Sequence, residues 1–359
     1  MTSRIASLWA TFVLLAAAFA TAQSSYTITD IGVLKGDNES SGFWINNSGE
    51  VVGCSDTETT YGYPCTGLVA GQHAFSWTKS GGIKDLGTLS GATVSGAVGI
   101  NDSGTVVGYS NVEGQLSTNF VAVQWSSTGA MTNLGTLWGG ASSAAFAINS
   151  AGEVAGDSFL SSGLVDATTW TSKKIQNIGA LSAAIFSAGL AINKSGEVVG
   201  ESVFGYGPPF TSHGFLWQNS VRKDLGTLPG GVTSMANGIN TSSVIVGQSD
   251  GNSTRGLWHA VLWNASDQIQ DLGTLPGGTY SIAFAVNDSS VVVGYGNIWD
   301  NAAHAMIWTS TGGMQDLNDL ISSGSGWVLA SANAINSSGQ ITGYGTKGGK
   351  NHAFLLTPK

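Results

Sequence analysis

Short runs of alternating apolar and polar residues, separated by clusters of Gly, Asn and Ser, fill this chain from residue 26 onward. Runs of this length, rich in β-branched and aromatic residues and bounded by turn formers, predict β-strands. One interval shows four such strands, which we name A, B, C and D in chain order: 234–240, 244–249, 259–263 and 268–275. No segment after residue 22 spaces its apolar residues at helical intervals over three turns. The pattern therefore predicts an all-β chain.

The same four-strand pattern returns along the whole chain. Its clearest marker is Asn-x-Ser-Gly-x-Val-Val-Gly or a close variant, which begins at Asn46, Asn101, Asn149, Asn193, Asn240, Asn287 and Asn336. The Asn side chain can accept a backbone N–H and the Gly can adopt positive φ, so this element predicts a tight turn between strands A and B. Self-similarity at a period of about 45 to 50 residues is typical of a propeller or an array.

The strand count decides between these architectures. Strand C occurs seven times, but strand D follows it only six times, and the missing strand D matches residues 26–34 at the start of the chain. The repeats span 41–89, 95–137, 142–181, 186–228, 234–275, 281–320 and 329–359. This order predicts a seven-bladed β-propeller of four-stranded antiparallel blades, closed by the N-terminal strand joining the last blade. A β-helix or β-solenoid, whose coils need not close, is the alternative.

Three motifs recur in fixed order: Asp-Leu-Gly-Thr-Leu in strand D, Ala-Ile-Asn-x-Ser-Gly at the A–B turn, and His-Ala-Phe-x-Trp in strand C. With these motifs, residues 26 to 359 resemble the HAF-type extracellular repeat family, named for the run seen at His73-Ala-Phe75 and His352-Ala-Phe354. The resemblance implies export and repetition, and it carries no activity, cofactor or partner with it.

Residues 1–22 have the pattern of a bacterial signal peptide: Arg4, an apolar run to Phe19, and Ala20-Thr21-Ala22. A retained membrane anchor is the alternative, although the run is shorter than the roughly 20 residues that a bilayer requires. We therefore expect a protein exported to the periplasm or the extracellular space, with no membrane span in the mature chain, and a single domain over 23–359. With 10% charged residues and a net charge of -9, nucleic acid and anionic membranes are poor partners.

Cys54 and Cys65 are the two cysteines of the chain, and both lie between strands B and C of the first repeat. In an exported protein we expect them to form one disulfide that closes this loop. Two free thiols or a metal pair are the alternatives. No His lies near them, and a metal site usually needs three or four ligands. No metal or other cofactor is predicted.

All five histidines begin a strand C, and each is matched by an Asp at the start of a strand D. The expected pairs are His73 with Asp85, His213 with Asp224, His259 with Asp271, His304 with Asp316, and His352 with Asp30. Where strand C begins with Val121 or Asp166, strand D begins with Asn133 or Asn177. We interpret the pairs as structural hydrogen bonds, because pairs spread around a ring cannot converge on one metal or catalytic site. The strand-C tryptophans are likewise predicted to be core.

Function is expected on the face that carries the B–C and D–A loops, because these loops vary in length while the other turns do not. Residues that break the repeat there are Trp138, Tyr206, Trp299, Asp300, Tyr61 and Tyr63. Exposed aromatic side chains stack on sugars or pack on protein partners. The sequence therefore predicts a non-catalytic binding or adhesion module for a polysaccharide or a cell-surface protein.

Two other classes of function stay open. A carbohydrate-active hydrolase or lyase could draw a pair of carboxylates from Glu58, Glu113, Asp157, Glu201, Asp250 and Asp300. No spacing singles out two of them, and the chain has no nucleophile elbow, phosphate loop or metal-binding His pair. An inert structural protein of the cell envelope is the third class.

Overall fold

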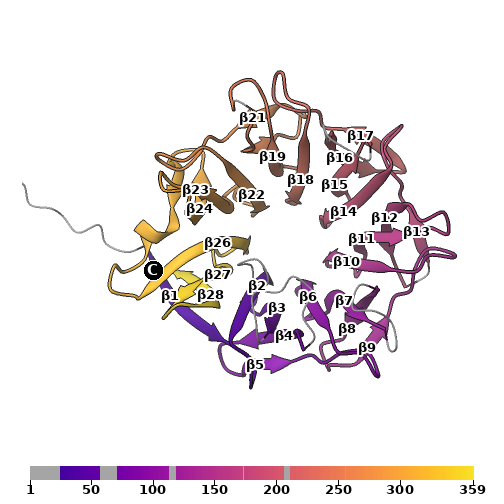
Figure 1. Cartoon of the computed structure of the whole chain (residues 1–359), viewed down its shortest axis with the longest axis horizontal. Coiled ribbons are helices and arrows are strands. Elements are labelled where there is room, and N and C mark those ends of the chain that lie inside the picture. The colour runs from indigo at the N-terminus through magenta and orange to yellow at the C-terminus, as the bar shows by residue number, and fades with distance from the viewer. Residues whose placement is uncertain (1–24, 57–70, 113–118, 173, 206–210, 255) are drawn as a thin grey trace, which may run out of the picture.

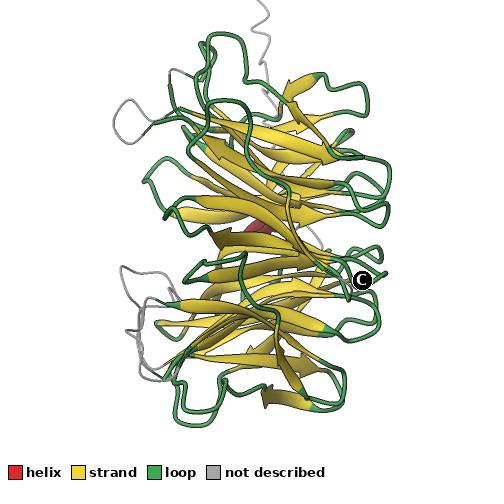
Figure 2. Cartoon of the chain, turned by 90° about the vertical axis from the view of Figure 1, so that its right-hand side faces the viewer, coloured by secondary structure: helices red, strands yellow, loops and turns green. Residues whose placement is uncertain are grey.

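The computed structural model describes residues 25–56, 71–112, 119–172, 174–205, 211–254 and 256–359. Sheets of short strands surround a central opening (Figure 1). Seen from the side, the strands form a disc and the loops project from its two opposite faces (Figure 2). The proposed signal peptide lies outside the described residues. Within the described part of the chain, no helix is both long enough and apolar enough to cross a membrane.

The strands follow the repeats of the sequence, and we number the repeats 1 to 7 in chain order. Repeat 1 contains β2 (Glu39–Ile45), β3 (Val51–Asp56), β4 (His73–Thr78) and β5 (Gly82–Asp85). Repeat 2 contains β6 (Ser95–Ile100), β7 (Val106–Asn111), β8 (Phe120–Trp125) and β9 (Met131–Asn133). Repeat 3 contains β10 (Ser143–Ile148), β11 (Val154–Phe159), β12 (Val165–Trp170) and β13 (Ile175–Asn177). Repeat 4 contains β14 (Phe186–Ile192), β15 (Val198–Val203), β16 (Ser212–Gln218) and β17 (Val221–Asp224).

The remaining repeats have the same order of strands. Repeat 5 contains β18 (Ser234–Ile239), β19 (Ile245–Ser249), β20 (His259–Trp263) and β21 (Ile269–Asp271). Repeat 6 contains β22 (Ser281–Val286), β23 (Val292–Asn297), β24 (Ala303–Thr309) and β25 (Gly313–Asp316), followed by the 3₁₀ helix η1 (Leu317–Leu320). Repeat 7 contains β26 (Trp327–Ile335), β27 (Ile341–Lys347) and β28 (Lys350–Pro358). The N-terminal strand β1 (Tyr26–Gly32) pairs with β28 in antiparallel register, from Tyr26 opposite Pro358 to Gly32 opposite Ala353.

Pairing groups these strands into five four-stranded sheets and one eight-stranded sheet. The eight-stranded sheet contains repeats 3 and 4, and a single parallel pair between Val165 and Phe186 joins its two halves. Separate sheets were expected for these repeats; instead Val165, the first residue of β12, pairs with Phe186, the first residue of β14. Within each repeat the pairing is antiparallel. The all-β propeller class with four-stranded antiparallel blades is thus confirmed.

Strand D is shorter than predicted. The Asp-Leu-Gly-Thr-Leu run was expected to be strand throughout, but β5 ends at Asp85 and β17 at Asp224. The reason is that the carboxylate accepts a hydrogen bond from the backbone N–H of Gly two residues later, as Asp85 does from Gly87 at 2.7 Å. Gly87 has a φ of +73°, a left-handed conformation that Gly adopts without steric cost. The chain therefore turns at the Asp and crosses to the next strand A.

Seven asparagines, one at each A–B turn, form a closed ring of hydrogen bonds. Each side-chain Oδ1 accepts backbone N–H groups of its own turn, and each Nδ2 donates to the backbone carbonyl of the next asparagine. The donor-to-acceptor distances from Asn46 onward are 3.3, 3.1, 3.2, 3.2, 3.0, 3.2 and 3.1 Å, through Asn101, Asn149, Asn193, Asn240, Asn287 and Asn336. The last bond runs from Asn336 back to Asn46, so this series returns to its start. Turn formation by Asn was predicted; the bond to the next repeat was not.

A serine at the start of strand A links most repeats to the one before. Ser95 Oγ, for example, accepts the backbone N–H of Ala74 at 2.9 Å and donates to the carbonyl of Gly87 at 2.7 Å. The same acceptor role is filled by Ser40, Ser143, Ser187, Ser234 and Ser281. These hydrogen bonds satisfy buried backbone groups at the joins between repeats.

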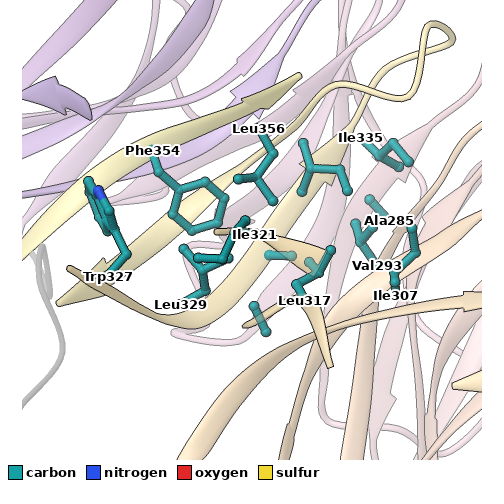
Figure 3. Close-up of a cluster of buried hydrophobic side chains, with 13 residues drawn as sticks. Ala285, Val293, Ile307, Leu317, Ile321, Trp327, Leu329, Ile335, Phe354 and Leu356 are labelled. Atoms are coloured by element: carbon teal, nitrogen blue, oxygen red, sulfur yellow. The ribbon is translucent and has the colours of Figure 1, made fainter. Parts of the chain in front are cut away.

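The hydrophobic core lies between neighbouring sheets. Between repeats 6 and 7, Val293 and Ile307 face Leu329, Phe354 and Leu356 in one buried cluster (Figure 3). The side chains of β1 take part, because Tyr26 and Ile28 pack against the same cluster. Most strand-C tryptophans are also buried, as predicted, and the indole N–H of Trp263 donates to the carbonyl of Leu225 in the preceding repeat.

Candidate ligand-binding cavity

Every strand A contains a bulge, and the bulged residue points to the centre of the ring. Pairing of strands A and B skips one residue, three positions before the ring asparagine. We call this the bulge position; its residues are Phe43, Val98, Phe146, Leu190, Asn237, Phe284 and Asn333. All seven line one central cavity and are half-buried. A bulge re-aims a side chain that regular pleating would direct between the sheets.

A second set of side chains lies nearer the face of the B–C and D–A loops. We call it the wall position, the residue after the strand-B glycine, and its members are Cys54, Tyr109, Asp157, Glu201, Gln248, Tyr295 and Tyr344. Each pairs with a strand-A residue that precedes the bulge, as Tyr109 does with Gly96. Tyr109, Tyr295 and Tyr344 line the cavity. The wall position is therefore above the bulge position on the variable-loop side.

The cavity has a volume of about 560 Å³, within the range of small-molecule sites. Aromatic rings dominate its lining: Phe43, Trp44, Tyr109, Phe146, Phe284, Tyr295 and Tyr344. The rings of Phe284 and Tyr295 stack with centroids 5.5 Å apart, and Tyr280 meets Tyr295 edge to face at 6.1 Å. A smaller cavity of about 370 Å³, bordered by Leu257, Trp258 and Tyr280, shares Tyr295 with the central one. Aromatic surface thus extends from the loops into the centre.

Two wall positions carry carboxyl groups in an environment that disfavours their charge. Burial raises the pKa of Asp157 to about 7, although a hydrogen bond from the backbone N–H of Ala144 acts to lower it. Burial alone raises the pKa of Glu201 to about 7. The residues opposite them on strand A are Ala144 and Ala188, whose small side chains leave room at the wall. These groups are poised to exchange a proton near neutral pH.

The other end of the channel is uniform and polar. A separate cavity of about 200 Å³ is lined there by the ring asparagines and the residues next to them. Its rim is tied together across repeats: Asp102 accepts the backbone N–H of Asn47 at 2.9 Å, and Asp288 accepts that of Thr241 at 3.0 Å. The side chains of the ring asparagines already have partners, so these amides offer few free contacts to a ligand.

The loop aromatics predicted from the sequence do not form one cluster. Trp138 is 98% exposed and Trp299 is 80% exposed. Trp138 lies between β9 and β10 and Trp299 between β23 and β24, strands on opposite sides of the ring (Figure 1). The carboxylate of the exposed Asp300 accepts the backbone N–H of Ala302. Tyr61, Tyr63 and Tyr206 lie outside the described residues.

Of the six carboxylates considered for catalysis, only Asp157 and Glu201 occupy the wall position. Asp250 is buried, and its Oδ1 accepts the backbone N–H groups of Val232 and Thr233, both at 2.8 Å. Its role is to hold the D–A loop, as Asn111 and Asn297 do in other repeats. Glu58 and Glu113 lie outside the described residues. Within the described part of the chain, no three His, Cys, Asp or Glu side chains gather as a metal site requires.

Each of the five histidines lies against its expected aspartate. The Nδ1-to-carboxylate distances are 2.9 Å for His73, 2.8 Å for His213, 3.0 Å for His259, 2.5 Å for His304 and 3.0 Å for His352. Asn177 donates to Asp166 at 2.7 Å in the variant repeat. The pairs differ in burial: side-chain exposure is 32% and 48% for His73 and Asp85, but 15% and 28% for His259 and Asp271.

Two of these aspartates, Asp271 and Asp30, have lowered pKa values. Burial acts to raise the pKa of Asp271, but hydrogen bonds from His259 and the N–H of Gly273, with the charge of His259, outweigh it and lower the pKa. The same balance lowers the pKa of Asp30, which also accepts hydrogen bonds from Lys347 and His352. Hydrogen bonds within the fold thus already occupy these two carboxylates. The Cys54–Cys65 disulfide stays a prediction, because Cys65 lies outside the described residues while Cys54 is fully buried in β3.

The central cavity was not predicted, although the sequence carries a signal for it. The bulge position is occupied by Phe, Val, Leu or Asn in different repeats, while the residues on either side of it are mostly Gly or Ala. At the wall position Tyr, Asp, Glu, Gln and Cys replace one another behind an invariant Gly. Such variation inside otherwise constant strands marks side chains that do not pack against a neighbouring sheet.

Comparisons with known proteins agree on the fold and no further. No protein-family profile and no curated sequence matches the chain. Among solved structures, the β-propeller domain of the Trilobed protease from Pyrococcus furiosus aligns with a TM-score of 0.57 at 9% identity, over 89% of this chain and 95% of that one. Oligogalacturonate lyase in complex with manganese aligns with a TM-score of 0.55 at 10% identity, over 94% and 95% of the two chains.

A puromycin-hydrolyzing peptidase from Mycobacterium tuberculosis aligns with a TM-score of 0.58 at 11% identity, over 94% of this chain and 54% of that one. This chain therefore spans about half the length of that peptidase. Identities this low show that the propeller architecture is shared. They assign no activity.

Proposed function

We propose that this chain is an exported, non-catalytic module of the HAF-type repeat kind that binds a carbohydrate in its central cavity. The ligand enters from the face of the B–C and D–A loops. The observation that carries the proposal is the aromatic lining of a cavity of about 560 Å³, with Phe284 stacked on Tyr295. Flat aromatic faces pack against the apolar C–H face of a sugar ring. The periplasm or the extracellular space is where such a ligand would be met.

The scaffold behind this function is, we infer, a seven-bladed ring closed by the N-terminal strand, with one repeat per blade. Two observations support the count and the closure. The asparagine hydrogen bonds run through seven repeats and return from Asn336 to Asn46. Strand β1 pairs with β28, so the last sheet contains the first and the last strand of the described chain. A closed ring would keep the cavity lining fixed in the absence of ligand.

The test is a binding screen of the chain without residues 1–22 against oligosaccharides and cell-surface polysaccharides, followed by calorimetry. Tyr295→Leu removes the ring but keeps apolar volume, and we expect it to weaken binding by about tenfold, equivalent to about 1.4 kcal/mol. Val221→Ser is the matched control, because Val221 is 65% exposed at the opposite face. Melting temperatures check that both variants fold.

Trp299→Ala separates the cavity from the loops. A loss as large as that of Tyr295→Leu would place the main contact on the loops and contradict the cavity. Unchanged binding by Tyr295→Leu would also contradict a ligand site in the cavity. Failure of every glycan to bind would overturn the carbohydrate proposal altogether.

A second candidate is a carbohydrate-active hydrolase or lyase, and one observation favours it. A carboxyl group with a pKa of about 7, such as that of Glu201, suits a general acid at neutral pH. The check is product release from the same glycans over a day. Turnover abolished by Glu201→Gln or Asp157→Asn, with binding retained, would establish the enzyme instead of the binding module.

A further inference from the structure

A second cavity lies between repeats 5 and 6, at the face of the variable loops. Its volume is about 370 Å³. Its lining includes Leu257 and Trp258, which precede β20, and Tyr280, Ile282 and Tyr295, which lie in or next to β22 and β23. Tyr295 also lines the central cavity. The two cavities thus meet at one side chain, and together they lead from the centre of the ring to the loops.

Aromatic side chains continue from the central cavity into this outer cavity. The ring of Phe284, in the central cavity, stacks on Tyr295 with the centroids 5.5 Å apart. Tyr280 meets Tyr295 edge to face at 6.1 Å, and Trp258 lines the outer cavity with both tyrosines. Successive sugars of a chain each present an apolar C–H face, so a series of aromatic side chains can contact several sugars in turn.

Hydrogen bonds hold the outer part of this series in position. The indole N–H of Trp258 donates to the hydroxyl of Thr233 at 3.0 Å. The side-chain oxygen of Asn297 accepts the backbone N–H groups of Thr279 and Tyr280 at 2.8 and 2.9 Å. Trp258 is nevertheless 45% exposed. An aromatic side chain that is already oriented loses little conformational entropy when a ligand packs on it.

The described residues that line the two cavities carry no formal charge. They are Trp, Phe, Tyr, Leu, Ile, Val, Ala, Gly, Ser and Asn, and the amides of Asn237 and Asn333 are among the polar groups. A charged ligand would lose its water there without gaining a counter-charge. The lining therefore favours a ligand that is uncharged and has both hydroxyl groups and apolar faces.

We infer that the two cavities form one extended site for a linear, neutral oligosaccharide. One part of the sugar chain occupies the central cavity, and the following sugars pass Tyr295 and pack on Tyr280 and Trp258 as the chain leaves toward the loops. The inference rests on the proposed carbohydrate function. It adds to that function a second subsite, a requirement for chain length and a requirement for neutrality.

The experiment measures affinity against chain length, by calorimetry of the chain without residues 1–22. The probes are β-linked oligomers of glucose, galactose, mannose and xylose, from disaccharides to hexasaccharides. We expect the affinity for the preferred series to rise by about tenfold or more with length. Trp258→Ala should remove most of this rise and leave the affinity for the disaccharide within about twofold. Tyr295→Leu should weaken every length, because Tyr295 lines both cavities.

Two further variants show whether the aromatic face of Trp258 is what matters. Trp258→Phe keeps an aromatic ring but loses the hydrogen bond to Thr233, so most of the rise with length should remain. Trp138→Ala is the matched control, because Trp138 is 98% exposed and lines neither cavity. It should leave every affinity unchanged. Melting temperatures check that all the variants fold.

The charge of the ligand gives a second measurement, which needs no variant. Oligomers of galacturonic acid and of glucosamine should bind at least about tenfold more weakly than the preferred neutral series of the same length. Tighter binding of either charged oligomer would overturn the inference and leave a carbohydrate module in place.

The remaining outcomes also separate this inference from the proposed function. An affinity that does not depend on length, or a rise with length that survives Trp258→Ala, would contradict the extended site while the central cavity still binds a sugar. Binding of none of the oligomers, neutral or charged, would overturn both proposals.

Discussion

The two ends of the central channel are built from the same seven repeats, yet they differ in uniformity. At the A–B turns every repeat supplies the same asparagine, and each one bonds to the next. At the wall position, a few residues along strand B, the repeats supply tyrosine, acid, amide and cysteine. A position that bonds one repeat to the next must be the same in every copy. The wall position, of which Tyr109, Tyr295 and Tyr344 line the cavity, is free of that constraint and can vary from repeat to repeat.

The strongest test of this contrast removes one ring asparagine. Asn240→Ala deletes the acceptor for the backbone N–H groups of Ser242 and Val244 and the donor to the carbonyl of Asn287. Buried groups lose their partners, so we expect a cost of about 2 to 4 kcal/mol. Chemical denaturation measures it.

Asn264→Ala is the matched control in the same repeat. Asn264 accepts the N–H groups of Ser266 and Gln268 in a turn of the same type, but it is half-buried, and within the described residues its side chain donates to Gln268 of its own turn and not to another repeat. We expect a cost below about 1 kcal/mol. Equal effects of the two substitutions would show that the bond between repeats contributes nothing.

At the wall position, replacing a carboxyl group by an amide should raise the free energy of unfolding instead of lowering it. The pKa of Glu201 is about 7 in the fold against an ordinary 4.5. Between these pH values the folded protein holds a proton that the unfolded chain has released, so the free energy of unfolding falls as pH rises from about 4.5 to 7. Glu201→Gln should therefore be more stable than the parent at pH 8 by about 1 to 2 kcal/mol, and not at pH 4. Melting curves at both pH values check this prediction. An equal gain in stability at pH 4 and pH 8 would contradict it.

The His/Asp pairs occupy the same face as the variable loops but behave as scaffold. We expect His259→Ala to cost about 1 to 1.5 kcal/mol, because this pair is among the less exposed. His73→Ala should cost less than about 0.5 kcal/mol, since its pair is about a third to a half exposed and screened by water. Urea unfolding of both variants ranks them; a reversed order would show that burial does not set their strength.

The smallest effect concerns pH. The pKa of Asp271 is lowered in the fold, so its stabilising contribution is present above the ordinary value of 3.8 and is lost as pH falls below it. Asp271→Asn should be destabilised relative to the parent at pH 7, and the difference should shrink at pH 3. A difference that persists at pH 3 would mean that packing, not charge, is what the substitution removes.

The sequence predicted those features that repeat. Strand order, the turn role of Asn46 and its counterparts, and the matching of His with Asp all follow from spacing, because each must recur in every copy. The limits of strand D were wrong, since the Asp85-to-Gly87 hydrogen bond that ends the strand is a local contact that a pattern of apolar residues does not record. The parallel pair that joins repeats 3 and 4 was missed for a similar reason.

The cavity could not be derived from spacing alone. A one-residue bulge at Phe43 moves a side chain from the core to the centre of the ring. The pattern of apolar and polar residues along the strand does not reveal this bulge. The loop residues Trp138 and Trp299 were singled out because each departs from the repeat pattern. That shared property does not require the two side chains to lie close together in the fold. Asp157 and Glu201 were named among six carboxylates. Their shared position in strand B would have separated them from the others.

The pairing of β1 with β28 also means that the described fold has its two ends side by side. The backbone N–H of Lys359 donates to the carbonyl of Ser25 at 3.0 Å. A short linker could therefore join these ends, and the chain could be reopened at another exposed turn, such as that between β16 and β17, with every strand keeping its neighbours. Circular permutation of this chain would then yield a family of rearranged genes that encode one and the same ring.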